Sequence, residues 1–300
     1  NALRVAVTSG APRRATTMRN RTLTLCIAVL LGPAAVSSQH PNASGGVLLP
    51  EQAAFDVRHY DLALAVDPAK QTIDGRLTMR ARMVADADRI ALHLDSRLTV
   101  TRVEAMGKPV HFGHEDGLIR ITFSGTVHAG DDVEVAVAYG GAPRVAPRPP
   151  WEGGFSWEES KGGHPWIATS CQGEGADLWW PCKDHPSDKP ETMDLRITVP
   201  RDLVCASNGT LESNTDNGDG TRTFHWHVAN PINNYCVALN IARYKIIERS
   251  YESVTGEEVP VMFFVLPEHQ DRGEKVLPEF LDHLRFFEEV CGPYPFRNEK

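Results

Sequence analysis

Apolar residues recur with a period of two through most of the chain, from about Phe55 to Ile241. Successive side chains of a β-strand point to opposite faces of a sheet, so this alternation places one face on a core and the other in water. Short alternating runs between Gly, Pro, Asp and Asn residues predict a mainly β chain that folds as an antiparallel β-sandwich. The alternating positions are Ile73, Leu77, Met79, Ala81, Met83, Ile90, Leu92, Leu94, Ile119, Ile121, Phe123, Val133, Val135, Val137, Tyr139, Leu195, Ile197, Val199, Phe224, Trp226, Val228, Tyr235, Val237, Leu239 and Ile241.

Turn and loop segments separate these runs. The sequence "DNGDG" at Asp216–Gly220 predicts a hairpin turn, because Asn and Gly tolerate a positive φ. Pro and Gly are frequent within 39–50 and 141–151, which predicts a linker and a long surface loop. Residues 51–244, which contain the alternating runs and the second of these two segments, are interpreted as one sandwich domain.

The pattern changes near residue 260. One further strand is predicted at Val261–Val265, followed by an amphipathic helix with Pro278 in its first turn or at a kink and Gly292–Pro293 at its end. One strand and one helix cannot bury a core, so residues 245–300 are interpreted as the incomplete start of a second domain. The apolar positions of this helix are Leu277, Phe280, Leu281, Leu284, Phe287 and Val290.

The N-terminal segment has the layout of a secretory signal. A basic head, Met18–Arg21, precedes the apolar run Thr22–Leu31, and small residues follow near Ser37. This predicts a signal peptide over residues 18–38, with residues 1–17 upstream of the natural start. A membrane anchor is the alternative, but a span needs about 20 apolar residues and this run has about half that. We therefore expect an exported chain with no membrane span after cleavage.

Net charge and cysteine content limit the possible classes of function and of disulfide bonding. A formal net charge of −8 argues against a nucleic-acid-binding surface. Export permits disulfides, but an odd number of cysteines follows the signal peptide, so at least one thiol stays free or pairs outside the chain. No pair has C-x-x-C spacing, so a cysteine zinc site is not predicted, and the favoured interpretation is buried structural cysteines with one bridge. These cysteines are Cys171, Cys182, Cys205, Cys236 and Cys291.

Two histidine patterns are candidates for metal binding. His114 and Glu115 begin an H-E-x-x-H string, which on a helix brings both histidines to one ion, but Leu118 replaces the second histidine and the context predicts a turn into a strand. His225 and His227 share one face of a strand, as metal ligands do and as residues of an ordinary solvated face also do. We expect no zinc site at His114 and favour the solvated face for the pair.

Nucleophile and phosphate motifs are missing from the sequence. It contains no G-x-S-x-G, no phosphate-binding loop and no dinucleotide fingerprint. Cys171 and Cys182 have His164 and His185 nearby in sequence, but the partners of a catalytic dyad meet in the fold and not along the chain. A cysteine hydrolase is therefore not predicted.

The segment "HPWIATSCQGEGADLWWPCKDHPSDKP", His164–Pro190, is the densest in functional residue types. Gly173 and Gly175 permit unusual backbone angles, Gln172 can donate and accept hydrogen bonds, and the tryptophans offer large packing areas. The segment is either a packed loop crossing the sandwich or a loop that presents Gln172 or Glu174 to a ligand. Its residues alone do not decide between these interpretations.

This segment and its surroundings resemble a known family. "TSCQGEGADLWWPCKDHPSDKPETMDLRITVP", "ASNGTL" and "FFEEVCGPYPFRNEK" are similar to stretches of the zinc aminopeptidase family of aminopeptidase N and leukotriene hydrolase. The resemblance extends from about Phe55 to Lys300 and is greatest to a secreted bacterial subgroup.

The resemblance implies a fold and a function. It implies an N-terminal β-sandwich-like domain followed by the first strand and helix of a thermolysin-like catalytic domain, in a periplasmic or extracellular bacterial peptidase. Family members bind zinc through H-E-x-x-H and a downstream Glu, and no such motif occurs in these residues, so zinc is expected to bind beyond Lys300 and this part alone to be inactive. Gln172 and Gly173 match the family's substrate-binding position near the peptide's amino terminus. The resemblance also implies a cis or strained Gln172–Gly173 bond.

Two alternatives remain open from the sequence. A secreted β-sandwich without catalytic activity fits the same strand pattern, and an epoxide hydrolase fits the same family. Side-chain preference, oligomeric state and disulfide pairing cannot be assigned from the residues.

Overall fold

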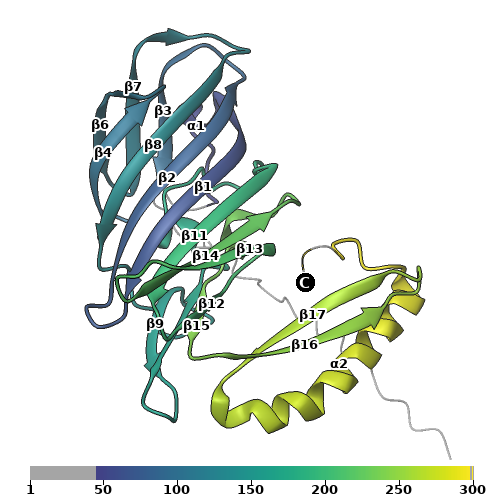
Figure 1. The fold of residues 1–300 in the computed structure, drawn as a ribbon. Coiled ribbons are helices and arrows are strands. Elements are labelled where there is room, and N and C mark those ends of the chain that lie inside the picture. The colour runs from purple at the N-terminus through teal and green to yellow at the C-terminus, as the bar shows by residue number, and fades with distance from the viewer. Residues whose placement is uncertain (1–44, 298, 300) are drawn as a thin grey trace, which may run out of the picture. The chain divides into compact units, whose positions relative to one another are not determined.

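The computed structural model describes residues 45–297 and 299 (Figure 1). The predicted upstream segment 1–17, the signal peptide 18–38 and residues 39–44 of the linker lie outside the described residues. None of the helices in the described part is long and apolar enough to span a membrane.

An eight-stranded sheet forms the centre of the sandwich. Its strands are predominantly antiparallel, as predicted, but β1 and β11 run parallel with His59 opposite Thr192. The strand order is β13 (Thr210–Asp216), β14 (Thr221–Val228), β11 (Thr192–Pro200), β1 (Phe55–Asp67), β2 (Thr72–Met83), β8 (Asp132–Gly141), β4 (Thr99–Ala105) and β5 (Lys108–Pro109).

Smaller sheets complete the described fold. In Figure 1 the three-stranded sheet lies at the end of the large sheet where β4 and β8 are found. It contains β3 (Ala87–His93), β7 (Leu118–Val127) and β6 (His111–Glu115), and a four-stranded sheet contains β12 (Val204–Ala206), β15 (Asn240–Ala242), β10 (Pro165–Ser170) and β9 (Gly154–Glu159). The short helix α1 (Pro50–Ala53) precedes β1, and 3₁₀ turns lie at Ala176–Leu178, Asn234–Cys236 and Pro267–His269.

A single cluster of buried apolar residues connects these sheets. Leu62 of β1, Ile121 of β7 and Ile167 of β10 all belong to it and are at most 1% exposed. The period-two pattern of β1, β2 and β11 appears directly as alternation of buried and less buried residues. The mainly β, sandwich-like fold predicted from that pattern is confirmed, and the hairpin turn between β13 and β14 lies at the predicted position.

One predicted strand is wrong. Residues from Tyr235 to Leu239 form a 3₁₀ turn and an irregular segment, and β15 begins only at Asn240. The side chain of Asn208 takes the place of a neighbouring strand: its Nδ2 donates to the Cys236 carbonyl at 3.1 Å, and its Oδ1 accepts from the Ala238 amide at 2.8 Å. The backbone is thus satisfied without a strand.

The last part of the chain contains one strand more than predicted. β16 (Lys245–Glu252) pairs with β17 (Glu258–Val265), and α2 (Gln270–Cys291) follows. Pro278 lies inside the helix, eight residues after its start, so the placement in the first turn is wrong. The helix ends at Gly292, as predicted.

The Glu288 carboxylate joins α2 to the hairpin. It accepts hydrogen bonds from the Tyr251 hydroxyl at 2.8 Å, the Ser253 hydroxyl at 2.9 Å, and the amides of Val254 and Tyr294 at 3.0 and 2.9 Å. Burial alone would raise the pKa of Glu288, but these hydrogen bonds outweigh it and lower the pKa to about 2.

Candidate functional site

The loop from Cys171 to Pro190, hereafter the 171–190 loop, is built on two buried tryptophans. Trp179 and Trp180 are fully buried. The Trp179 indole donates to the Cys171 sulfur at 3.2 Å, and Trp180 packs edge-on against Tyr60 with ring centroids 5.1 Å apart. The aromatic side chains therefore fix the loop to the sandwich core, as in the packed-loop interpretation.

A buried ion pair fixes the second half of the loop. Lys183 Nζ lies 2.7 Å from Asp188 Oδ2, and both side chains are about 95% buried, at 6% and 5% exposure. Lys183 Nζ also donates to the Phe55 carbonyl at 2.6 Å, and the Val57 amide donates to Asp188 Oδ2 at 3.2 Å. Because both ions are paired and hydrogen-bonded to the start of β1, the loop is tied to that strand at two points.

A second polar network supports the middle of the loop. The Ala176 amide donates to Asp184 Oδ2 at 3.1 Å, and the Asp184 amide donates to His93 Nδ1 at 3.3 Å. Burial, and then the neighbouring Asp184 carboxyl, raise the pKa of Asp177 well above its usual range. Asp184 thus supports the loop from within, with 5% of the residue exposed.

The predicted site residues Gln172 and Gly173 lie at the exposed tip of this loop. The amides of Glu174 and Gly175 both donate to the Cys171 carbonyl, at 3.0 and 2.8 Å, and thereby close a tight turn around the pair. Gly173 has a φ of 84°, a left-handed angle that favours glycine. Of the cis or strained Gln172–Gly173 bond that was predicted, the cis form is wrong: the cis bond among the described residues is Pro149–Pro150.

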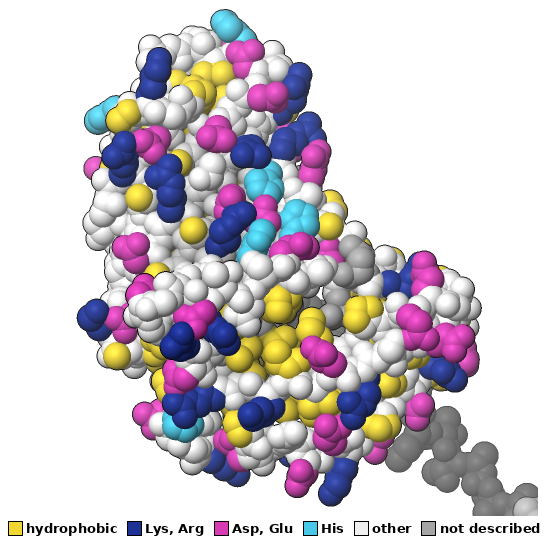
Figure 2. All heavy atoms as spheres, viewed as in Figure 1, with side chains coloured by type: hydrophobic (Ala, Val, Ile, Leu, Met, Phe, Trp, Pro, Cys, Tyr) yellow, Lys and Arg dark blue, Asp and Glu magenta, His cyan; other side chains and the backbone are white. Residues whose placement is uncertain are grey.

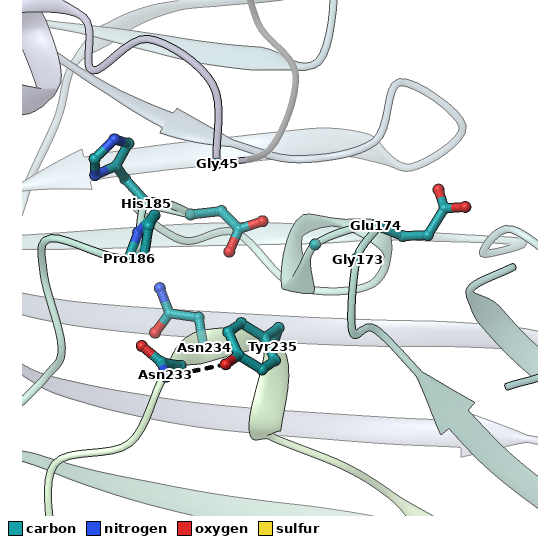
Figure 3. A pocket seen from close by; sticks show the side chains of 10 residues that line it. Gly45, Gly173, Glu174, His185, Pro186, Asn233, Asn234 and Tyr235 are labelled. Atoms are coloured by element: carbon teal, nitrogen blue, oxygen red, sulfur yellow. Dashed lines mark hydrogen bonds between the residues drawn. The ribbon is translucent and has the colours of Figure 1, made fainter. Parts of the chain in front are cut away.

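A small cavity lies beside the loop tip (Figure 3). Its volume is about 210 Å³, and Gly173 lines it together with Glu174, His185 and the segment Asn233–Tyr235, whereas Gln172 does not. The Glu174 carboxylate points away from Asn233 and Tyr235 in Figure 3 and pairs with Arg144 at 2.7 Å. Pockets for drug-sized ligands measure roughly 300–1,000 Å³, so this cavity fits one side chain or a short peptide end.

The cysteines are structural, as predicted, in the sandwich core. Cys171, Cys182 and Cys205 are buried free thiols, and burial raises the pKa of Cys171 to about 12. A thiol with so high a pKa is a poor nucleophile at neutral pH. Cys236 and Cys291 are free as well but exposed, so the prediction of burial is wrong for these two.

The described residues do not fit the zinc site of the resembled family. His114 lies on β6, where its Nε2 contacts the Leu94 carbonyl at 3.0 Å, and Leu118 begins β7 and is fully buried. Glu115 and Leu118 are thus joined by the turn into a strand that the sequence context predicts.

The other histidine pair lies on the face of β14 opposite the buried Phe224 and Trp226. His225 Nε2 and His227 Nδ1 both contact Asp194 Oδ1 of β11, at 2.7 and 3.0 Å. Sequence reasoning missed both Asp194 and His59, which contacts it from β1. The signal was present, because the alternation that buries Leu195 and Tyr60 turns their neighbours Asp194 and His59 to the opposite face.

Comparisons with known proteins agree with this geometry. The profile of the Peptidase M1 N-terminal domain matches residues 57–236. The M1 zinc metallopeptidase of Deinococcus radiodurans has a similar structure, with a TM-score of 0.64 and 23% identity over 81% of this chain and 55% of that one. A point variant of that protein bound to a Tyr-Ser-Ala substrate gives a TM-score of 0.62 with the same identity and coverage. A comparison with curated proteins gave no match.

The extent of these matches decides the assignment. Structural similarity at this identity shows a shared fold, and the chain spans 55% of the length of those solved structures. The profile match extends over more than half of the 300 residues and includes the whole 171–190 loop. The family predicted from the loop and its flanking motifs is confirmed: the chain belongs to the M1 zinc metallopeptidase family and carries its N-terminal domain.

Proposed function

We propose that this chain is the N-terminal part of an exported bacterial zinc aminopeptidase, in which it forms one wall of the peptide-binding site. The observation that carries the proposal is the 171–190 loop, whose exposed tip, Gln172–Gly173, stands on a buried scaffold. A neutral amide with a donor and an acceptor suits the amino terminus of a peptide, whose ammonium group needs an acceptor. The zinc and its ligands lie outside these residues, and this part alone is inactive.

The exposed apolar side chains of α2 support the proposal that this chain is part of a larger protein and packs against further polypeptide. Phe280, Phe286, Phe287 and Val290 are 43–66% exposed, on a helix that buries Leu277 against β16 and β17. Contiguous exposed apolar side chains mark surfaces that pack against other protein. In the proposed enzyme this surface packs against the remainder of the catalytic domain.

The test uses the complete reading frame that contains this chain. We expect hydrolysis of amino-acid arylamides that a chelator abolishes and Zn²⁺ restores, because the metal supplies the activated water in this family. Activity that persists in the presence of the chelator would contradict the proposal, as would activity of the 300-residue chain alone.

A substitution at the loop tip tests the role of Gln172. Gln172→Ala removes a hydrogen bond to a charged group, which is worth about 1.5–3 kcal/mol, so we expect KM to rise by roughly 10- to 150-fold with a smaller change in kcat. Ser187→Ala, at an exposed position of the same loop, is the matched control and should leave KM unchanged. Equal effects of the two substitutions on KM would show that Gln172 does not bind the substrate.

A further inference from the structure

The outward face of the large sheet carries a cluster of histidines and acids that the proposed function does not use. β1, β11 and β14 are neighbours in the sheet, with Asp194 of the middle strand paired in register to Asp61 on one side and to His227 on the other. Figure 2 shows histidine side chains gathered among acidic ones on this face. The cluster consists of His59, Asp61, Asp194, His225 and His227.

The Asp194 carboxylate is the centre of the cluster. His225 and His227 contact its Oδ1 at 2.7 and 3.0 Å, and His59 Nε2 lies 3.3 Å from its Oδ2. The side chains of Asp194 and His59 are each 17% exposed, so the centre is shielded from solvent although it opens on the surface. Imidazoles from two different strands therefore converge on one carboxylate of the strand between them.

Asp194 differs from other acids of this face, Asp61 included, which are paired with arginine. Glu134 and Asp132 of β8 are paired with Arg80 and Arg82 of β2, and Glu104 of β4 is paired with Arg76. An arginine partner neutralises a carboxylate but has no lone pair to bind a metal. At Asp194 the partners are imidazoles, each of which has a nitrogen lone pair in its neutral form.

The donor atoms are close enough to share one ion. His59, Asp61 and Asp194 each offer a ligand atom, and these atoms lie within 4.8 Å of one another. Nitrogen and carboxylate oxygen together are the donor set of Zn²⁺ and neighbouring transition-metal ions, whereas Mg²⁺ and Ca²⁺ prefer oxygen alone. The ion pair between Arg196 and Asp61 weakens the attraction for a cation and leaves His59 and Asp194 as the stronger ligands.

The orientation of His59 is fixed by a neighbour. His59 Nδ1 lies 2.8 Å from Thr192 Oγ1, the residue opposite it on β11, and this contact turns Nε2 toward Asp194. A hydrogen bond on the remote ring nitrogen is the usual support of a metal-binding histidine.

We propose that His59, Asp61 and Asp194 bind a divalent transition-metal ion of the Zn²⁺ class. His227, which lies opposite Asp194 on β14 and is 36% exposed, provides the fourth ligand by rotation of its side chain. The ion would replace the hydrogen bonds between imidazole and carboxylate and link β1, β11 and β14 across the sheet. A site of this kind adds to the proposed function and does not depend on it.

The experiment is a Zn²⁺ titration of the 300-residue chain by calorimetry, after treatment with chelator. The sequence contains no H-E-x-x-H motif, so a bound equivalent reports on other residues. Cys236→Ser and Cys291→Ser are introduced first, because these exposed thiols could bind zinc themselves. We expect one equivalent of Zn²⁺, and a visible Co²⁺ spectrum of nitrogen and oxygen ligands without a thiolate band.

Substitutions test which side chains bind the ion. Asp194→Asn and His59→Gln should abolish binding, and Thr192→Val should weaken it about tenfold or more through the loss of the support to His59. His128→Gln is the matched control, since His128 forms an exposed contact with Asp86 at 3.1 Å elsewhere in the sandwich. Circular dichroism checks that each variant folds. A chain that binds no Zn²⁺, or whose Asp194→Asn variant binds it as tightly as the parent, would overturn the proposal.

Discussion

In the β-sandwich, one cluster of buried apolar residues reaches from the large sheet into the smaller ones, and the Lys183–Asp188 ion pair is buried in the same domain. The hairpin–helix unit of β16, β17 and α2 has a core of five buried residues, namely Ile247, Tyr251, Val259, Val261 and Leu277. Glu288 is buried beside this core and accepts hydrogen bonds from Tyr251 of the hairpin and from Tyr294, which follows the helix. The stability of a large core is distributed over many contacts, whereas that of a small core depends on a few. Substitutions should therefore change the stability of the two regions by different amounts.

The largest effect is expected from the ion pair inside the sandwich. Lys183→Met leaves the Asp188 carboxylate buried without its partner, and breaking a buried pair in this way costs about 3–5 kcal/mol. Thermal unfolding followed by circular dichroism should show the loss across the whole sandwich, because Lys183 and Asp188 bind the start of β1.

Two further variants separate charge from packing at this site. Lys189→Met removes a lysine from an exposed position of the same loop and should leave stability within about 0.5 kcal/mol of the parent. The double variant Lys183→Met/Asp188→Asn removes both charges and should recover part of the loss. If the double variant is less stable than Lys183→Met alone, the unpaired charge is not the cause.

A smaller and local effect is expected in the hairpin–helix unit as the pH falls. The folded-state pKa of Glu288, about 2, lies below its ordinary value of 4.5, so its stabilisation is present above about pH 4.5 and is lost as the pH falls toward 2. The loss of hydrogen bonds to a charged acceptor is worth about 2–3 kcal/mol. The protection of the Val254 and Tyr294 amides, measured as exchange relative to the intrinsic rate at each pH, should therefore fall over this range before protection in the large sheet does.

The substitution Glu288→Gln should remove this pH dependence and accelerate exchange at neutral pH. Glu289→Gln changes the next residue, which is exposed, and should preserve the dependence. Equal exchange profiles for Glu288→Gln and the parent chain would show that Glu288 does not hold the unit together.

The same two regions differ in how far the sequence predicted them. Period-two alternation identified β2, β11 and β14 of the large sheet, because each of them buries residues at every second position. It did not identify β13, which has no buried residue. β16 was missed because it buries only Ile247 and Tyr251, four residues apart, a spacing that resembles a helix as much as a strand. The strand predicted at Tyr235–Ile241 failed because a side chain, Asn208, satisfies that backbone, and no local pattern shows such a partner.

The candidate site was predicted in part for a similar reason. The motif around Gln172 identified the family and the exposed loop tip, since local residues carry both. The support of the loop comes from residues far away in sequence, for instance Tyr60 under Trp180 and Phe55 beside Lys183, which only the fold brings together. The cluster around Asp194 depends on the parallel pairing of β1 with β11. The sequence does not predict this pairing, because it does not show which strands become neighbours in the sheet.

The smallest effect on stability is expected at the loop tip, where Gly173 has a φ of 84° and an added Cβ would meet nothing within 4 Å. Gly173→Ala should therefore cost only the backbone strain of a left-handed alanine, about 1 kcal/mol. Gly163, with a φ of 70° and equally open surroundings in the turn between β9 and β10, is the matched control, and Gly163→Ala should destabilise by a similar amount. In the proposed full-length enzyme only Gly173→Ala should raise KM, by roughly fivefold, because the strain shifts the adjacent Gln172. Equal KM values for the two variants would mean that the loop tip does not touch the substrate.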